Sequence, residues 1–105
     1  MATAYIYDAV RTPRGKGKKD GSLYTTKAVE LLTTAFKAVQ ERNNLDTSLV
    51  EDSIIGCVTQ SWEQSGDIAK AAAIHAGYHD IVAGVTLNRF CGSGLEAINQ
   101  AAAYI

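Results

Sequence analysis

Stretches with the pattern of a β-strand alternate with stretches of helical periodicity along the 105 residues. Runs of β-formers and apolar residues predict strands, whereas apolar residues three and four positions apart predict helices. The expected strands are residues 4–10, 53–59 and 82–87, and the expected helices are residues 25–42, 67–76 and 91–105. Strands that alternate with helices form parallel sheets covered on both faces. We therefore expect an α/β fold of β-α-β-α-β-α order, with three mainly parallel strands and helices on both faces.

Composition argues against several classes of protein. The chain is 47% hydrophobic and 20% charged, as in ordinary soluble domains, and its net charge of −1 gives no indication of a nucleic-acid-binding surface. We interpret the basic run from Arg14 to Lys19 as an exposed loop and not as a phosphate or nucleic-acid site. No apolar run reaches about 18 residues, so no membrane span is expected. The first residues also lack the pattern of a signal peptide.

The two cysteines, Cys57 and Cys91, form no CxxC motif and no dense framework, which favours a reducing compartment. We expect the cytoplasm, and an organelle matrix is also compatible. Cys57 lies within the expected strand 53–59 and is interpreted as a small core residue. His75 and His79 have the spacing of zinc ligands on a helix, but Gly77 between them is expected to end that helix. No metal site is therefore expected.

Cys91 stands where the expected strand 82–87 gives way to the last helix. The start of a helix presents unpaired backbone N–H groups and the positive end of the helix dipole, and both attract negative charge. The thiolate is the nucleophilic form of cysteine, so this position suits a nucleophile. Gly92 and Gly94 carry no side chain that would keep a substrate carbonyl from the N–H groups. One turn can therefore supply an attacking sulfur and the donors for an oxyanion.

Residues 87–98, LNRFCGSGLEAI, resemble the acyl-enzyme signature of the thiolases, and residues 11–23, RTPRGKGKKDGSL, resemble the early segment of degradative 3-ketoacyl-CoA thiolases. The alternative for Cys91 is a buried structural cysteine. The segment after Cys91 contains Gly92 and Gly94 but not the third glycine of a G-x-G-x-x-G motif, so a dinucleotide-binding site is not expected there.

The resemblance implies that Cys91 attacks the 3-keto carbon of a 3-ketoacyl-CoA and carries an acyl group, which coenzyme A then removes as co-substrate. It implies no tightly bound cofactor. The family also uses a histidine from a Gly-His-Pro motif and a second cysteine from a Cys-x-Gly motif, and neither motif occurs in these 105 residues. We therefore expect residues 1–105 to be an incomplete N-terminal thiolase domain, truncated within the active-site helix and inactive alone.

The resemblance further implies a homodimer or tetramer of the whole protein. The expected interface residues are Trp62, Gln64, Val85 and Leu87, because the matching loop lies near the dimer contact and the matching strand pairs with its own copy. Packing of Trp62 over the next helix is the alternative. The expected strand 4–10 would lie at an unprotected sheet edge. Two other functions stay open: a ketoacyl synthase-like condensing enzyme, and a non-catalytic truncated product.

Overall fold

The computed structural model describes residues 2–105 and contains three α-helices and two β-strands. In chain order the elements are α1 (Ala28–Asn43), the 3-10 turn η1 (Thr47–Leu49), β1 (Asp52–Gly56), the 3-10 turn η2 (Trp62–Gln64), α2 (Ile68–His75), β2 (Ala83–Leu87) and α3 (Ser93–Ala103). The structure has no helix long and apolar enough to cross a membrane within this range.

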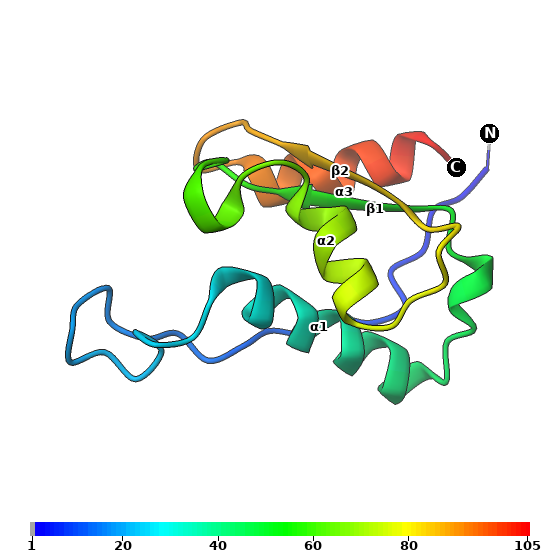
Figure 1. The fold of residues 1–105 in the computed structure, drawn as a ribbon. Coiled ribbons are helices and arrows are strands. Elements are labelled where there is room, and N and C mark those ends of the chain that lie inside the picture. Colours follow the sequence, from blue (N-terminus) through cyan, green and yellow to red (C-terminus); the bar gives the residue numbers. More distant parts are fainter. Residues whose placement is uncertain (1) are drawn as a thin grey trace.

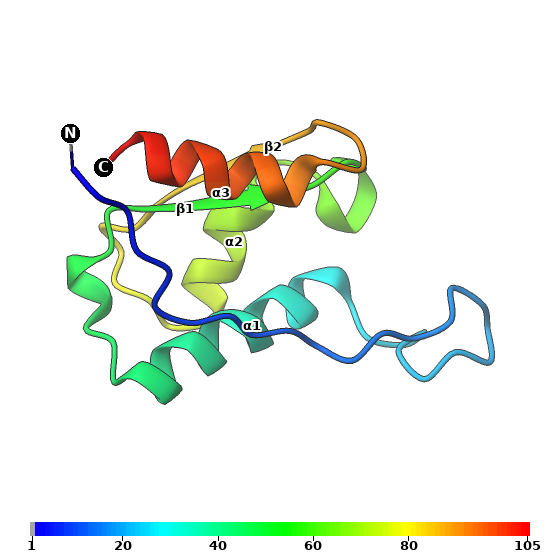
Figure 2. The same cartoon turned by 180° about the vertical axis from the view of Figure 1, so that it is seen from behind.

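The two strands form a parallel sheet in which Ile54 pairs with Val85. Helix α3 contacts β1 on one face of the sheet, and α2 contacts both strands on the other face (Figures 1 and 2). Helix α1 packs on α2 and forms the outer layer on that side of the sheet (Figure 1). The expected α/β fold with helices on both faces of a parallel sheet is confirmed.

The prediction of a strand at residues 4–10, the first of the three expected strands, is wrong. The segment is without assigned secondary structure, and the only sheet of residues 2–105 contains β1 and β2. The side chains of Tyr5, Ile6 and Tyr7 are between 73% and 91% exposed. β-propensity describes how well a residue fits a pleated, half-buried surface, and a segment without a neighbouring strand has no such surface. The segment instead runs past the end of the sheet and along α1 (Figure 2).

Asp8 attaches this N-terminal segment to the end of α1. Its carboxylate accepts hydrogen bonds from Asn43 Nδ2 at 2.9 Å and from the Ala9 backbone N–H at 2.7 Å, and it pairs with Arg42 Nη2 at 3.1 Å. The hydrogen bond from Asn43 is the main reason why the pKa of Asp8 is lowered, with further contributions from Ala9 and Arg42. The charged carboxylate is therefore the form that holds the segment against the helix.

The ends of the helices follow local signals. Helix α1 begins after Lys27, whose backbone N–H donates to Glu30 Oε2 at 2.9 Å, and not after Thr25 or Thr26 as expected. Asn44 ends α1 in the left-handed conformation, with φ of 47°. Gly77, with φ of 80°, follows Ala76, the C-cap of α2, and lies at the end of the helix as predicted.

The core is small and lies between α1, α2 and the start of β2. Its buried cluster consists of Ala73, Ala76, Tyr78 and Val82, and Phe36 and Val50 pack against it. Tyr78 donates its hydroxyl to the Phe36 carbonyl at 2.7 Å, and burial raises its pKa. Gly84 allows the close approach of α2 to β2, because a Cβ at this position would lie 2.5 Å from the backbone nitrogen of Lys70.

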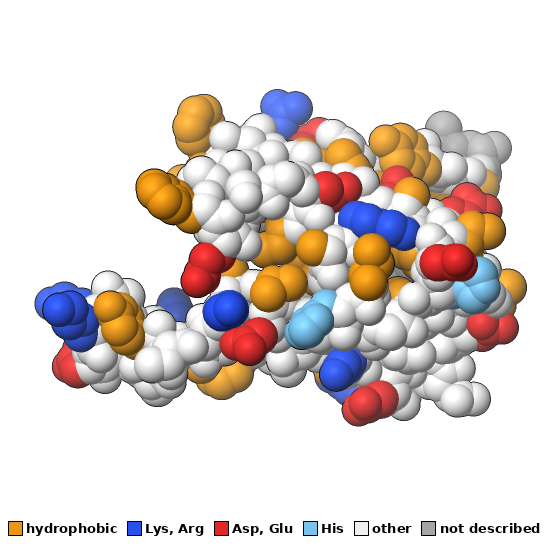
Figure 3. All heavy atoms as spheres, viewed as in Figure 1, with side chains coloured by type: hydrophobic (Ala, Val, Ile, Leu, Met, Phe, Trp, Pro, Cys, Tyr) orange, Lys and Arg blue, Asp and Glu red, His pale blue; other side chains and the backbone are white. Residues whose placement is uncertain are grey.

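Helix α3 is covered on one side only. Its small residues Ser93 and Ala97 are buried against the sheet side, whereas Leu95 and Ile98 are 66% and 57% exposed. The basic loop from Arg14 to Lys19 is exposed as expected and projects from the body of the chain (Figures 1 and 3).

Candidate active site at the start of α3

Cys91 lies in the connection between β2 and α3, two positions before the first residue of the helix. It is exposed, whereas Cys57, directly after β1, is buried with 7% exposure. Cys91 is therefore not a buried structural cysteine. Cys57 is a buried residue as predicted, although it follows the strand and does not lie within it.

The turn that carries Cys91 is tightly hydrogen-bonded. Asn88 Oδ1 accepts the Phe90 N–H at 2.8 Å, and the Gly92 N–H donates to the Arg89 carbonyl at 3.0 Å. Phe90 has φ of 47°, the left-handed region that bulky residues rarely adopt. This conformation reverses the chain immediately before Cys91 and leads it into α3.

Backbone donors are available beside Cys91. The N–H groups of Cys91, Gly94 and Leu95 donate no hydrogen bond to any acceptor in residues 2–105. The first N–H groups of a helix have no partner within the helix, which explains the availability of the donors at Gly94 and Leu95. A Cβ at Gly94 would meet no atom within 4 Å, and one at Gly92 would meet only the Arg89 carbonyl oxygen at 3.5 Å. The surface above the helix start is therefore open.

Gly56 sets the distance between the sheet and this helix start. A Cβ at Gly56 would lie 2.5 Å from the Ser93 carbonyl carbon and 2.7 Å from the Gly94 nitrogen, closer than real Cβ atoms approach. Only glycine fits at this contact without a shift of the backbone. Gly56 was not predicted to support the site, although a glycine inside an apolar run often marks a close approach of another backbone.

The four expected interface residues have different surroundings. Trp62 is 92% exposed, so it does not pack over the next helix. Gln64 is turned inward, and its Oε1 lies 3.7 Å from Cys57 Sγ. Val85 is 37% exposed and Leu87 is half-buried, and both belong to β2, whose second edge has no partner strand in the described chain. The structure therefore places Val85 and Leu87 on one strand and Trp62 in η2, and Thr86 Oγ1 lies 3.4 Å from Gln60 Oε1 in the loop before η2.

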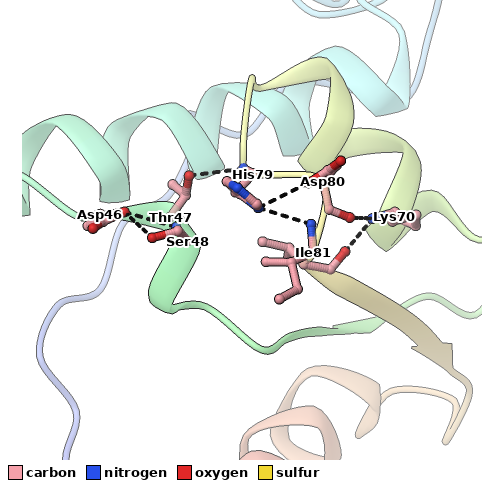
Figure 4. Close-up of polar contacts among 8 residues, drawn as sticks. Asp46, Thr47, Ser48, Lys70, His79, Asp80 and Ile81 are labelled. Carbon is pink, nitrogen blue, oxygen red and sulfur yellow. Dashed lines mark hydrogen bonds and ion pairs between the residues drawn. The ribbon is translucent and has the colours of Figure 1, made fainter.

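His79 takes part in a polar network between η1 and the loop after α2 (Figure 4). Its backbone N–H donates to Thr47 Oγ1 at 3.0 Å, and its Nδ1 lies 3.2 Å from the Ile81 nitrogen. Lys70 Nζ donates to the Asp80 and Val82 carbonyls of the same loop. Residues 2–105 contain no group of three or more His, Cys, Asp or Glu side chains that could hold a metal ion.

The chain also resembles known proteins in its sequence and in its fold. The model of the thiolase N-terminal domain matches residues 4–105. The chain belongs to the thiolase family. Among curated relatives it is 45% identical over 103 residues to a 3-ketoacyl-CoA thiolase of Shewanella denitrificans, a match that covers 97% of this chain and 26% of the relative. It is 43% identical over 98 residues to a beta-ketoadipyl-CoA thiolase of Pseudomonas knackmussii, covering 92% and 24%.

The solved structures include the Bacillus anthracis acetyl-CoA acetyltransferase, which superposes with a TM-score of 0.71 at 33% identity. The alignment covers 78% of this chain and 21% of that structure. The expected resemblance of the chain to the thiolases is thus confirmed. The chain spans about a quarter of the length of the thiolases that it matches.

Proposed function

We propose that Cys91 is the acyl-accepting nucleophile of a thiolase that acts on 3-ketoacyl-CoA. The proposal is carried by one observation: in a thiolase N-terminal domain, the exposed cysteine lies at the start of α3 beside unpaired N–H groups. Such donors stabilise the negative charge that develops on a carbonyl oxygen under attack. The Cys91 N–H is the donor that we assign to this oxyanion, and Gly92 and Gly94 leave the approach open.

The reaction has two steps. The Cys91 thiolate adds to the 3-keto carbon, the bond between carbons 2 and 3 breaks, and its electron pair passes to the acetyl-CoA fragment, which takes up a proton. The acyl group remains on Cys91 as a thioester until the sulfur of coenzyme A attacks it, and the coenzyme A thiol gives up a proton that balances the one taken up in the first step. The thiolate of Cys91 then leaves, and the acyl-CoA is two carbons shorter. Coenzyme A is thus a co-substrate, the reverse sequence gives condensation, and no tightly bound cofactor takes part.

Labelling by iodoacetamide tests the nucleophile. In the unaltered chain near neutral pH, we expect Cys91 to be alkylated about tenfold faster than glutathione, because it is exposed and precedes a helix start with unpaired N–H donors, and we expect Cys57 to stay nearly unlabelled. Peptide mass spectrometry measures both rates, and Cys57 serves as the internal control because it is buried. The same chain should not cleave acetoacetyl-CoA, because these residues lack the Gly-His-Pro and Cys-x-Gly motifs. Equal, slow labelling would contradict the proposal and favour the non-catalytic alternative.

We also propose that the open edge of β2 is where a second copy of the chain pairs, as the resemblance implies for a homodimer or tetramer. An exposed edge strand presents unpaired backbone groups to another strand, and a lysine on it opposes such pairing. We expect the unaltered chain to associate in sedimentation velocity experiments and Val85→Lys to be mainly monomeric. Val58→Lys is the control, because Val58 is also exposed but lies outside both strands. Equal association of both variants would contradict the proposal.

A further inference from the structure

The hydroxyl of Ser93 joins the start of α3 to the turn that carries Cys91. Ser93 is 5% exposed, and its Oγ accepts the Arg89 N–H at 2.9 Å and donates to the Phe90 carbonyl at 2.6 Å. The Ser93 backbone N–H also donates to the Phe90 carbonyl, at 3.1 Å. One buried residue therefore forms hydrogen bonds with the backbone of both residues that immediately precede Cys91.

These hydrogen bonds hold a backbone conformation that side-chain packing does not hold. Phe90 has φ of 47°, and its ring is not buried, because the residue is 76% exposed. A bulky residue keeps a left-handed conformation only when its surroundings restrain it. The restraints on Phe90 are the bonds from Ser93 to its carbonyl and the bond from its N–H to Asn88 Oδ1. The conformation of this turn determines where the sulfur of Cys91 lies relative to the helix start.

Ser93 is itself held from the other side by the sheet. Gly56 at the end of β1 lies so close to Ser93 that a Cβ on the glycine would be 2.7 Å from the Ser93 carbonyl oxygen. The backbone of Ser93 is thus fixed by β1, while its side chain fixes the turn. The chain of contacts runs from the sheet through Ser93 to the residue before Cys91.

We propose that Ser93 is a positioning residue for Cys91, which keeps the sulfur beside the free N–H groups of the helix start. The inference rests on the proposed function of Cys91. Ser93 does not touch the reacting atoms in this mechanism, and it acts through Arg89 and Phe90. Loss of its hydroxyl leaves the turn free to relax, which moves the sulfur away from the donors.

The test compares alkylation of Cys91 in Ser93→Ala with the unaltered chain. We expect a loss of rate on the order of tenfold in Ser93→Ala, because small displacements of a reacting group have large kinetic effects. Ser93→Thr keeps the hydroxyl and should restore most of the rate. The matched control is Ser53→Ala, which removes another buried hydroxyl, bonded at 2.9 Å to the Ala83 carbonyl, far along β1 from the turn. Ser53→Ala should leave the rate of Cys91 unchanged.

The labelling of Cys57 reports whether each variant is folded. If Ser93→Ala makes Cys57 reactive as well, Ser93 supports the whole fold and the positioning role is overturned. If Cys91 is alkylated equally fast in the unaltered chain and in Ser93→Ala, the positioning role of Ser93 is overturned and the proposed function of Cys91 is not. A Cys91 that reacts no faster than glutathione in the unaltered chain would overturn the proposed function and this role together.

Discussion

Gly56→Ala is expected to lower the free energy of unfolding by about 3 kcal/mol, the upper range for an atom forced into a packed contact. The added methyl group would lie 2.5 Å from the Ser93 carbonyl carbon and 2.7 Å from the Gly94 nitrogen. Both are backbone atoms, so no side-chain rotation can relieve the clash, and α3 must move away from β1. For a chain of this size the loss corresponds to a decrease of roughly 10–20 °C in Tm, which circular dichroism measures.

Gly94→Ala is the matched control for Gly56→Ala. Both substitutions add one methyl group to the same contact region, but a Cβ at Gly94 meets no atom within 4 Å. Gly94 also lies within α3, where alanine is favoured over glycine by about 1 kcal/mol. We expect unchanged or slightly higher stability for Gly94→Ala. A Gly56→Ala chain as stable as the unaltered one would show that the helix start is not seated against the sheet as described.

Val82→Ala is expected to lower the free energy of unfolding by about 2 kcal/mol through lost burial and an unfilled cavity. Val82 is 0% exposed and is the largest fully buried side chain of the described residues. Its neighbours in the cluster include Ala73 and Ala76, whose short side chains cannot move in to fill the space. Denaturant unfolding measures the change, and a small domain has little stability in reserve.

The preceding residue provides the control for Val82→Ala. Ile81 is 63% exposed, and Ile81→Ala removes more carbon atoms than Val82→Ala does. Surface substitutions usually change stability by no more than about 0.5 kcal/mol. An equal loss in the two variants would show that burial at Val82 is not what stabilises the loop before β2.

The parts of the structure that depend on near neighbours in the chain could be predicted. The helical spacing of apolar residues located α1, α2 and α3 to within a few residues, and Gly77 marked the end of α2 because its positive φ favours glycine. The place of Cys91 between β2 and α3 was predicted for the same reason, since the strand pattern and the helix pattern meet there.

Contacts between distant segments could not be predicted in this way. The residues of segment 4–10 have the composition of a strand, yet a strand also requires a partner, and none pairs with this segment in residues 2–105. The close approach of Gly56 to Ser93 depends on how α3 crosses β1, and no local sequence pattern indicates that crossing. The hydroxyl of Ser93 likewise gains its role only when the turn folds back over it.

The sequence by itself determined the alternating order of helices and strands, the family and the cysteine at the start of α3, because each of these depends on patterns within a few residues. Only the tertiary structure decided that the sheet has two strands, that Cys91 is exposed while Cys57 is buried, and that Gly56 and Ser93 support the turn. The physical reason is that burial and close approach are properties of pairs of segments, and the chain must fold before those pairs exist.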